Sequence, residues 1–101
     1  MTPVNITSEN FDSFLRSDRT ILLDFYANWC APCRALSPVV EEFSRENPEI
    51  PVGKINVDMQ QDLATRYGVM SIPTLIVLRN SKIAARATGV RSKEQIREMI
   101  Q

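Results

Sequence analysis

The chain has 101 residues, 44% of them hydrophobic, and its twelve Lys and Arg residues balance twelve Asp and Glu residues. This length supports one hydrophobic core, so we expect a single domain over residues 1–101. The composition is that of a globular protein and excludes a disordered chain. A net charge of zero, with arginines spread singly, argues against a nucleic-acid or anionic-membrane surface.

The sequence suggests neither a membrane protein nor an exported one. The longest apolar run, residues 21–27, is far shorter than a membrane span and contains Asp24. Residues 1–7 carry neither the basic nor the apolar segment of a secretory leader. The location that we expect is therefore the cytoplasm.

The chain contains no histidine, and this absence excludes several mechanisms. Ser-His and Cys-His nucleophile pairs are ruled out, as are most zinc sites. The reactive side chains that remain are Cys30 and Cys33, which form a Cys-x-x-Cys pair.

The first predicted elements are a short strand and a helix. Val4 and Ile6 alternate with polar neighbours, which is typical of an edge strand. Thr7 or Ser8 can cap a helix that we expect to end near residues 17–18. The apolar stripe of this helix consists of Phe11, Phe14 and Leu15.

A buried strand and a long helix follow. Residues 21–27 are nearly all apolar, which indicates a central strand covered by helices on both faces. Apolar residues then recur at helical spacing, at Leu36, Val39, Val40 and Phe43. Cys30 and Cys33 therefore lie in the turn from strand to helix. Pro38, inside the helix, predicts a kink rather than an end.

The next segment predicts a second strand and a short helix. Residues 52–57 have the apolar character of a buried strand. Asp58 with Gln61 forms the pattern of a capping box, which would open a short helix through Leu63, Ala64 and Tyr67. Gly68 is placed to end that helix.

The C-terminal part predicts a hairpin and a last helix. Residues 75–78 and 83–88 have the pattern of two strands joined by the polar turn 79–82. Ser92 with Gln95 caps a helix that carries Ile96, Met99 and Ile100. The element order is β-α-β-α-β-α-β-β-α. We therefore expect an α/β fold with a single mixed sheet flanked by helices on both faces.

A cysteine pair at a strand-to-helix turn points to redox chemistry. Unpaired backbone N–H groups and the positive end of the helix dipole favour a thiolate at the first cysteine. The second cysteine, inside the first turn, lies within bonding reach and is expected to be less exposed. We therefore expect Cys30 to attack a substrate disulfide and Cys33 to attack the resulting mixed disulfide.

Other interpretations of the pair remain open. A structural disulfide closing so short a loop constrains the unfolded chain little. A zinc site within one chain lacks ligands, because tetrahedral zinc takes four. A metal or iron–sulfur site shared by two chains through Cys30 and Cys33 is a further alternative.

The sequence around the cysteines resembles the thioredoxin family. Residues 24–34, Asp-Phe-Tyr-Ala-Asn-Trp-Cys-Ala-Pro-Cys-Arg, are similar to that family's D-F-W-A-x-W-C-G-P-C signature. Further similarities follow in order along essentially the whole chain: Pro38, residues 54–58, residues 67–69, residues 72–74 and Gly89. The resemblance implies the thioredoxin fold, with the cysteines at the start of the second helix.

The resemblance also implies roles for individual residues. It makes Cys30 the nucleophile and Cys33 the resolving thiol of a reversible disulfide. Asp24 matches a buried acidic residue that the family has behind the cysteine pair. Lys54 matches a lysine near that aspartate, and Pro73 matches a cis-proline opposite the disulfide. An Asp within an apolar strand is desolvated, which raises its pKa and suits it to proton transfer near neutral pH. The alternative is an Asp24 that is structural and satisfied by hydrogen bonds or by Lys54.

An apolar surface around the sulfurs would suit protein substrates. Its expected members are Trp29, Ala31, Pro32, Val69, Ile72, Pro73, Gly89 and Val90. Because a proline offers no N–H, the Ile72 peptide can present its own N–H and C=O to an extended substrate strand. We expect Phe25 and Tyr26 to belong to the core.

The chain departs from the family pattern at three positions. Ala31 replaces the common glycine between the cysteines, Tyr26 a frequent tryptophan, and Ser71 a common glycine. Since the residues between the cysteines tune the redox equilibrium, Ala31 predicts a modest shift in potential with reductant behaviour preserved.

The resemblance implies a general protein-disulfide reductase with no bound cofactor or metal. Its electrons would come from NADPH through a thioredoxin reductase, its substrates would be protein disulfides, and it would act as a monomer. The alternatives are a thiol oxidant or isomerase, and a redox-independent binding module.

Overall fold

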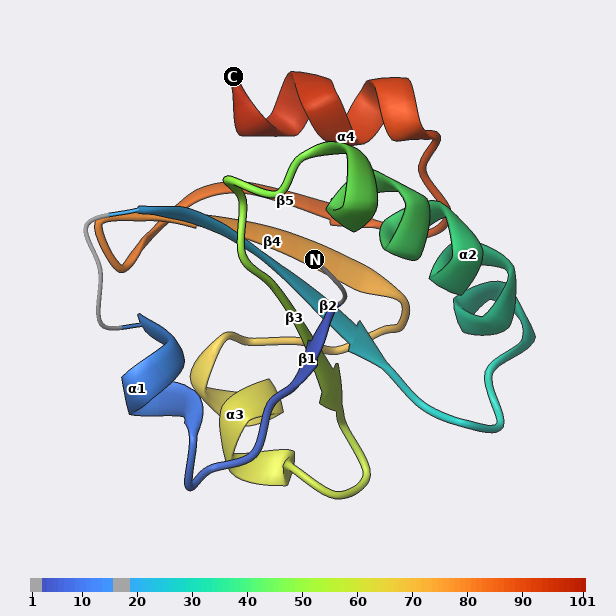
Figure 1. The fold of residues 1–101 in the computed structure, drawn as a ribbon. Helices are drawn as coiled ribbons and strands as arrows, with labels where there is room; N and C mark the ends of the chain where they lie inside the picture. Colours follow the sequence, from blue (N-terminus) through green and yellow to red (C-terminus); the bar gives the residue numbers. More distant parts are fainter. Residues whose placement is uncertain (1–2, 16–18) are drawn as a thin grey trace.

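The computed structural model describes residues 3–15 and 19–101 and shows one five-stranded sheet between two layers of helices (Figure 1). In chain order the elements are β1 (Val4–Asn5), α1 (Phe11–Leu15), β2 (Thr20–Tyr26), α2 (Ala31–Glu46), β3 (Val52–Asn56), α3 (Gln61–Arg66), β4 (Thr74–Arg79), β5 (Lys82–Thr88) and α4 (Lys93–Ile100). This order is the predicted one. The predicted α/β fold with a single mixed sheet is thereby confirmed.

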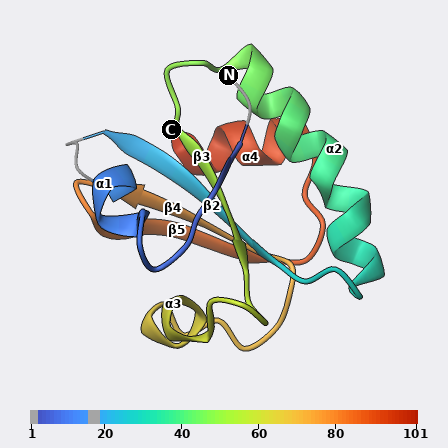
Figure 2. The same ribbon diagram turned by 60° about the horizontal axis from the view of Figure 1, so that its bottom comes forward.

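The sheet has the strand order β1-β3-β2-β4-β5. β1, β3 and β2 run parallel, whereas β4 and β5 are antiparallel to their neighbours. β2 is the central strand, as its apolar run predicts, and residues 21–25 are fully buried. Helices α1 and α3 lie on one side of the sheet and α2 and α4 on the other (Figures 1 and 2).

Side chains of β2 alternate between the two helical layers. Ile21, Leu23 and Phe25 join the core under α1 and α3, while Leu22 joins the core under α2 and α4. Because successive strand residues point to opposite faces, Asp24 faces the same layer as Leu22. The aspartate is thus directed toward the helix that carries the cysteines.

The long helix α2 begins where the sequence predicts. Cys30 is its N-cap residue, and the helix continues through Pro38 to Glu46. Pro32 lies in the first turn, where its missing N–H costs no helical hydrogen bond. No helix of the described residues is long and apolar enough to cross a membrane.

One of the two predicted capping boxes is wrong. Helix α3 begins after Gln60, whose side chain makes no capping bond, and not after Asp58. The Asn56 side chain accepts the backbone N–H groups of Asp58 and Met59, which forms an extra turn before the helix. The box of Ser92 and Gln95 at α4 is confirmed.

The start of α1 depends on Thr7 rather than Ser8. The Thr7 hydroxyl accepts the N–H of Asn10, whose side chain accepts the N–H of Thr7 in return. The predicted end of this helix, near residues 17–18, lies outside the described residues.

Candidate active site

Cys30 and Cys33 are joined by a disulfide at the N-terminus of α2. Their Cα atoms are 5.2 Å apart, within the usual range for a disulfide. The backbone N–H of Cys33 donates to the Sγ of Cys30 at 3.2 Å. The first sulfur therefore occupies the place of an N-cap acceptor, where helix N–H groups stabilise negative charge.

Cys30 and Cys33 are equally buried, and each residue is 4% exposed. The expectation that Cys33 is less exposed than Cys30 is therefore wrong. Ala27 and Ile72 belong to the same apolar cluster as both. The cysteines differ in what lies behind them. Cys33 lines a pocket of about 210 Å³, here called the inner cavity, which opens to solvent beside Asn28 and Arg34 and which Cys30 does not line.

Asp24 is 1% exposed, and its Oδ1 has no hydrogen-bond partner among the described residues. Burial raises the pKa of its carboxyl to about 6, and the positive charge of Lys54 opposes part of this rise. Oδ1 is therefore not satisfied by a hydrogen bond among the described residues, and the charge of Lys54 does not cancel the effect of burial. Asp24 is a buried acid able to titrate near neutral pH.

Lys54 lies beside Asp24 but does not form an ion pair with it. The two residues are partners in the parallel register of β2 and β3, so they share a face of the sheet. The Lys54 ammonium instead donates to Ser37 Oγ at 3.0 Å and lies 4.7 Å from the centre of the Tyr26 ring. Tyr26, which the sequence predicts to be core, is half-buried here.

The peptide bond between Ile72 and Pro73 is cis, as the resemblance implies. The N–H of Gly89 donates to the Pro73 carbonyl at 2.8 Å, which brings the loop after β5 beside this peptide. The Pro73 side chain is buried and adds no exposed area to the predicted docking surface. The reason is its place at the start of β4, whose residues 74–78 are all buried.

Most other members of the predicted docking surface are accessible. Trp29 is 68% and Val90 48% exposed, Ala31 and Pro32 are exposed, and Val69, Ile72 and Gly89 are half-buried. A shallow hollow of about 350 Å³ lies between Trp29 and the loop before Pro73. Its lining residues are Trp29, Val57, Val69, Met70, Ser71 and Ile72.

Three residues at the site are not predicted by the sequence patterns. Met70 is 97% exposed and lines the hollow. Its position two residues before Ile72 is the sequence feature that could have placed it at the site. Asp58 accepts a hydrogen bond from the Trp29 indole at 2.8 Å, a contact with no local sequence pattern. Ser37 follows Cys33 by one helical turn, a spacing that places both on one face of α2.

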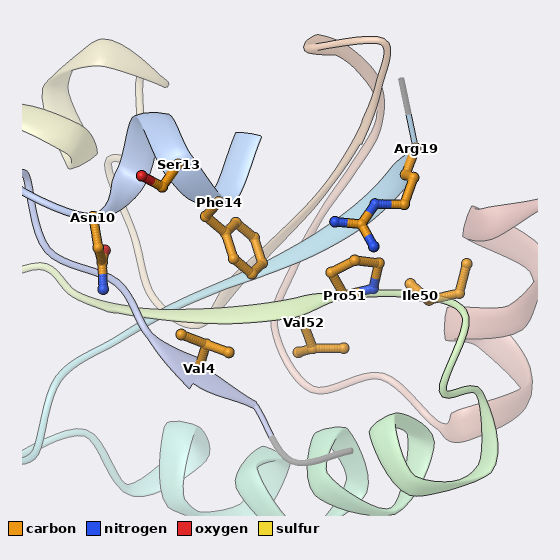
Figure 3. A pocket seen from close by; sticks show the side chains of 8 residues that line it. All are labelled: Val4, Asn10, Ser13, Phe14, Arg19, Ile50, Pro51 and Val52. Atoms are coloured by element: carbon orange, nitrogen blue, oxygen red, sulfur yellow. The ribbon is translucent and has the colours of Figure 1, made fainter. Parts of the chain in front are cut away.

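A second hollow of about 350 Å³ lies at the other end of the sheet, where β2 and β3 begin (Figure 3). It contains none of the predicted site residues. Its lining residues are Val4, Asn10, Ser13, Phe14, Arg19, Ile50, Pro51 and Val52. In the described part of the chain, no three acidic, cysteine or histidine side chains gather as metal ligands.

A disulfide-forming Cys-x-x-Cys pair at a helix N-terminus, next to a central strand of this fold, defines a thiol-disulfide oxidoreductase. Comparison with known proteins narrows the class. The thioredoxin family model matches residues 2–101, and the chain belongs to the thioredoxin family.

Individual relatives agree with this assignment. The chain is 45% identical over 95 residues to a thioredoxin of Chlamydia pneumoniae, covering 94% of this chain and 92% of that protein. It is 40% identical over 101 residues to a thioredoxin of Bacillus subtilis (strain 168), with 99% and 96% covered. The structure of a mutant thioredoxin from Halobacterium salinarum superposes with a TM-score of 0.90 at 33% identity, covering 98% of this chain and 88% of the other.

Proposed function

We propose that this thiol-disulfide oxidoreductase is a general protein-disulfide reductase. The Cys30 thiolate attacks one sulfur of a substrate disulfide, forms a mixed disulfide and releases the other substrate sulfur as a thiolate. The Cys33 thiolate then attacks the Cys30 sulfur, releases the second substrate thiolate and leaves the Cys30–Cys33 disulfide. Two electrons pass from the dithiol to the substrate in each cycle.

One contact carries the assignment of Cys30 as the attacking thiol. Its sulfur accepts the N–H of Cys33 at the N-terminus of a helix of 16 residues. The partial positive charge there stabilises a thiolate and lowers the pKa of a thiol. Cys33 lies within the helix and borders the inner cavity, which suits the thiol that attacks second.

Asp24 supports the second step as a proton acceptor. Its carboxylate faces the layer of α2, is buried and has an Oδ1 without a hydrogen-bond partner among the described residues. With a pKa raised to about 6, it is ionised at neutral pH yet basic enough to take a proton from the Cys33 thiol. The transfer is direct or passes through one water.

The docking surface supports a protein substrate. A substrate strand can pair with the Ile72 peptide, in the manner of β-augmentation, and place its disulfide against Cys30. Ile72 packs against the cysteine pair, and Trp29 flanks it with a large exposed ring. Ala31, Pro32, Gly89 and Val90 complete the apolar border.

We further propose that a thioredoxin reductase returns the disulfide to the dithiol with electrons from NADPH. A cytoplasmic location fits this supply, because the cytosol maintains reduced thiols. The chain would act as a monomer over residues 1–101, with no bound cofactor. Size-exclusion chromatography with light scattering and an NADPH-coupled reductase assay test these statements.

The central test is catalysis of insulin reduction by dithiothreitol, together with the redox equilibrium of the pair in glutathione buffers. We expect acceleration that depends on Cys30, and a potential more negative than the roughly −200 to −230 mV of glutaredoxins. A potential at or above that range would favour the oxidant or isomerase. Absence of acceleration would favour a binding module.

A further inference from the structure

The inner cavity behind Cys33 is lined by polar groups of three elements. Its volume is about 210 Å³, and it lies between the ends of β2 and β3 and the first turns of α2. The lining residues are Tyr26, Ala27, Asn28, Cys33, Arg34, Ser37 and Lys54. The resolving cysteine and Lys54 thus border the same small space.

Two contacts hold the Lys54 ammonium at this cavity. It donates at 3.0 Å to Ser37 Oγ, a hydroxyl one turn along α2 from Cys33. It also lies 4.7 Å from the centre of the Tyr26 ring, a distance at which the ring face attracts a cation. The lysine is therefore anchored on one side by α2 and on the other by β2.

These contacts divert the lysine from the acidic residue that is its register partner. Asp24 and Lys54 are register partners on one face of the sheet, yet they form no ion pair and Asp24 Oδ1 has no hydrogen-bond partner among the described residues. Opposite charges attract strongly where burial excludes water. An unanchored Lys54 would be expected to close on the carboxylate.

We propose that Ser37 and Tyr26 are positioning residues that hold the Lys54 ammonium apart from Asp24 and thereby keep Asp24 available as the proton acceptor of Cys33. This inference deepens the proposed function and rests on the role given there to Asp24. An ammonium in contact with a carboxylate stabilises its ionised form and makes it a poorer base. Ser37 and Tyr26 prevent that contact.

Few other charges bear on Asp24. Lys54 faces it from β3, Arg34 and Cys33 face the cavity from α2, and Tyr26 lies on its own strand. The residue paired with Asp24 on β4 is the apolar Leu75. The Arg34 guanidinium donates to the carbonyl of Asn28 at the rim. Burial raises the pKa of Asp24, and Lys54 is the charge that opposes this rise.

The test is an NMR titration of the Asp24 side-chain carboxyl carbon in the oxidised full chain. In Ser37→Ala, Lys54 loses its acceptor and approaches Asp24, so we expect the pKa of Asp24 to fall by about one unit or more. Ser37→Thr keeps a hydroxyl and should titrate like the parent protein. Ser44→Ala removes a different hydroxyl of α2, one that is buried, and serves as the control. An unchanged or raised pKa in Ser37→Ala would overturn the proposal.

Two further variants make the result independent of how well Ser37→Ala folds. Tyr26→Leu removes the ring and should also lower the pKa of Asp24. Lys54→Met should raise it, and Ser37→Ala added to Lys54→Met should cause no further change, because no ammonium remains to move. An equal shift in the presence and absence of Lys54 would show that Ser37 acts in another way and would overturn the proposal.

Kinetics separate this inference from the role of Asp24 itself. The rate at which a Cys30 mixed disulfide is resolved should follow the titration of Asp24, with its pH midpoint shifted in Ser37→Ala. If the NMR titration shifts while the pH profile of resolution stays that of the parent protein, the catalytic consequence and the proposed role of Asp24 are overturned. Only the inference that Ser37 and Tyr26 hold Lys54 apart from Asp24 would then be supported.

Discussion

The burial of Asp24 lowers the stability of the fold but raises the proton affinity that the proposed chemistry uses. Its strand is central and buried, so folding is favoured by every apolar neighbour and opposed by an ionised carboxylate. Among the described residues, the side chain has neither an ion pair nor a hydrogen bond at Oδ1 to offset its burial. Such a group is retained at a cost in stability, which is expected where its proton affinity serves the chemistry.

The first prediction concerns stability and pH. The folded-state pKa of Asp24, about 6, lies above its ordinary value of 3.8, so the folded protein binds this proton more tightly than the unfolded chain. The contribution of Asp24 to stability therefore falls as pH rises from about 4 to about 6. We expect oxidised Asp24→Asn to exceed the parent protein in free energy of unfolding at pH 7 by on the order of 3 kcal/mol.

Urea unfolding of the oxidised proteins at pH 4 and pH 7 measures this difference. The gain from Asp24→Asn should be small at pH 4 and large at pH 7. Asp62→Asn removes an exposed carboxylate in α3 and should show no such pH-dependent gain. An equal gain for Asp24→Asn at both pH values would contradict the raised pKa.

The second prediction separates the roles of the two sulfurs. Cys33→Ser leaves the attacking thiol intact and removes the resolving one, so a mixed disulfide between Cys30 and substrate should accumulate. Cys30→Ser lacks the sulfur stabilised at the helix N-terminus and should accumulate none. Non-reducing electrophoresis and mass spectrometry after incubation with a disulfide-containing protein measure both. Equal trapping by the two variants would show that the roles are wrongly assigned.

At the scale of elements, the edge of the sheet depends on a close approach between three segments. Gly53 of β3 is buried beneath Ile6 and Phe14. A Cβ at Gly53 would lie 2.7 Å from Ile6 Cγ1 and 3.1 Å from Phe14 Cε2. The absence of a side chain at this position therefore lets the segment after β1 and the helix α1 pack closely on β3.

The third prediction follows from this packing. Where space allows, replacing glycine by alanine stabilises a protein by about 0.4–1 kcal/mol, because it reduces the conformational entropy of the unfolded chain. Overpacking a core costs about 1–3 kcal/mol, and the 2.7 Å contact makes it the larger effect. Gly53→Ala should therefore lower the free energy of unfolding, measured by urea titration.

The control for this prediction is a double-mutant cycle. In Ile6→Ala the atom nearest the new Cβ, Ile6 Cγ1, is gone, so Gly53→Ala should cost clearly less there than in the parent protein. Additive effects of the two substitutions would mean that the clash with Ile6 is not the cause.

At the scale of the whole molecule, the docking surface is assembled from separate loops. Trp29 precedes α2, Ile72 precedes β4, and Val90 follows β5. The hydrogen bond from Gly89 to the Pro73 carbonyl joins the last two loops. All three lie at one end of the sheet, because β2 ends where β4 begins and β5 ends there too.

The fourth prediction tests this surface. Val90→Asp places a charge on it without removing a catalytic group, so kcat/KM for insulin should fall several-fold while reduction of a small disulfide changes little. Ile83→Asp is a matched control, because Ile83 is also 48% exposed but lies at the other end of β5. Equal losses in both variants, or equal losses for both substrates, would argue against docking at Val90.

Much of the fold and site follows from local patterns. The element order, the central place of β2 and the helix start at Cys30 are confirmed, because apolar periodicity and the cysteine spacing are local signals. The Asp58 capping box fails because a capping pattern competes with other partners, here the Asn56 turn and the distant Trp29 indole. The spacing of residues in the sequence does not show which of these hydrogen-bond partners a side chain will take.

The sequence by itself determined the chemistry available to this protein: two cysteines, no histidine and one acid within an apolar strand. Tertiary structure decided which groups act on that acid. Strand register sets Lys54 beside Asp24, and the packing of α2 on the sheet gives the ammonium Ser37 as an alternative partner. Electrostatic coupling depends on distances between elements remote in sequence, and only the folded chain fixes those distances.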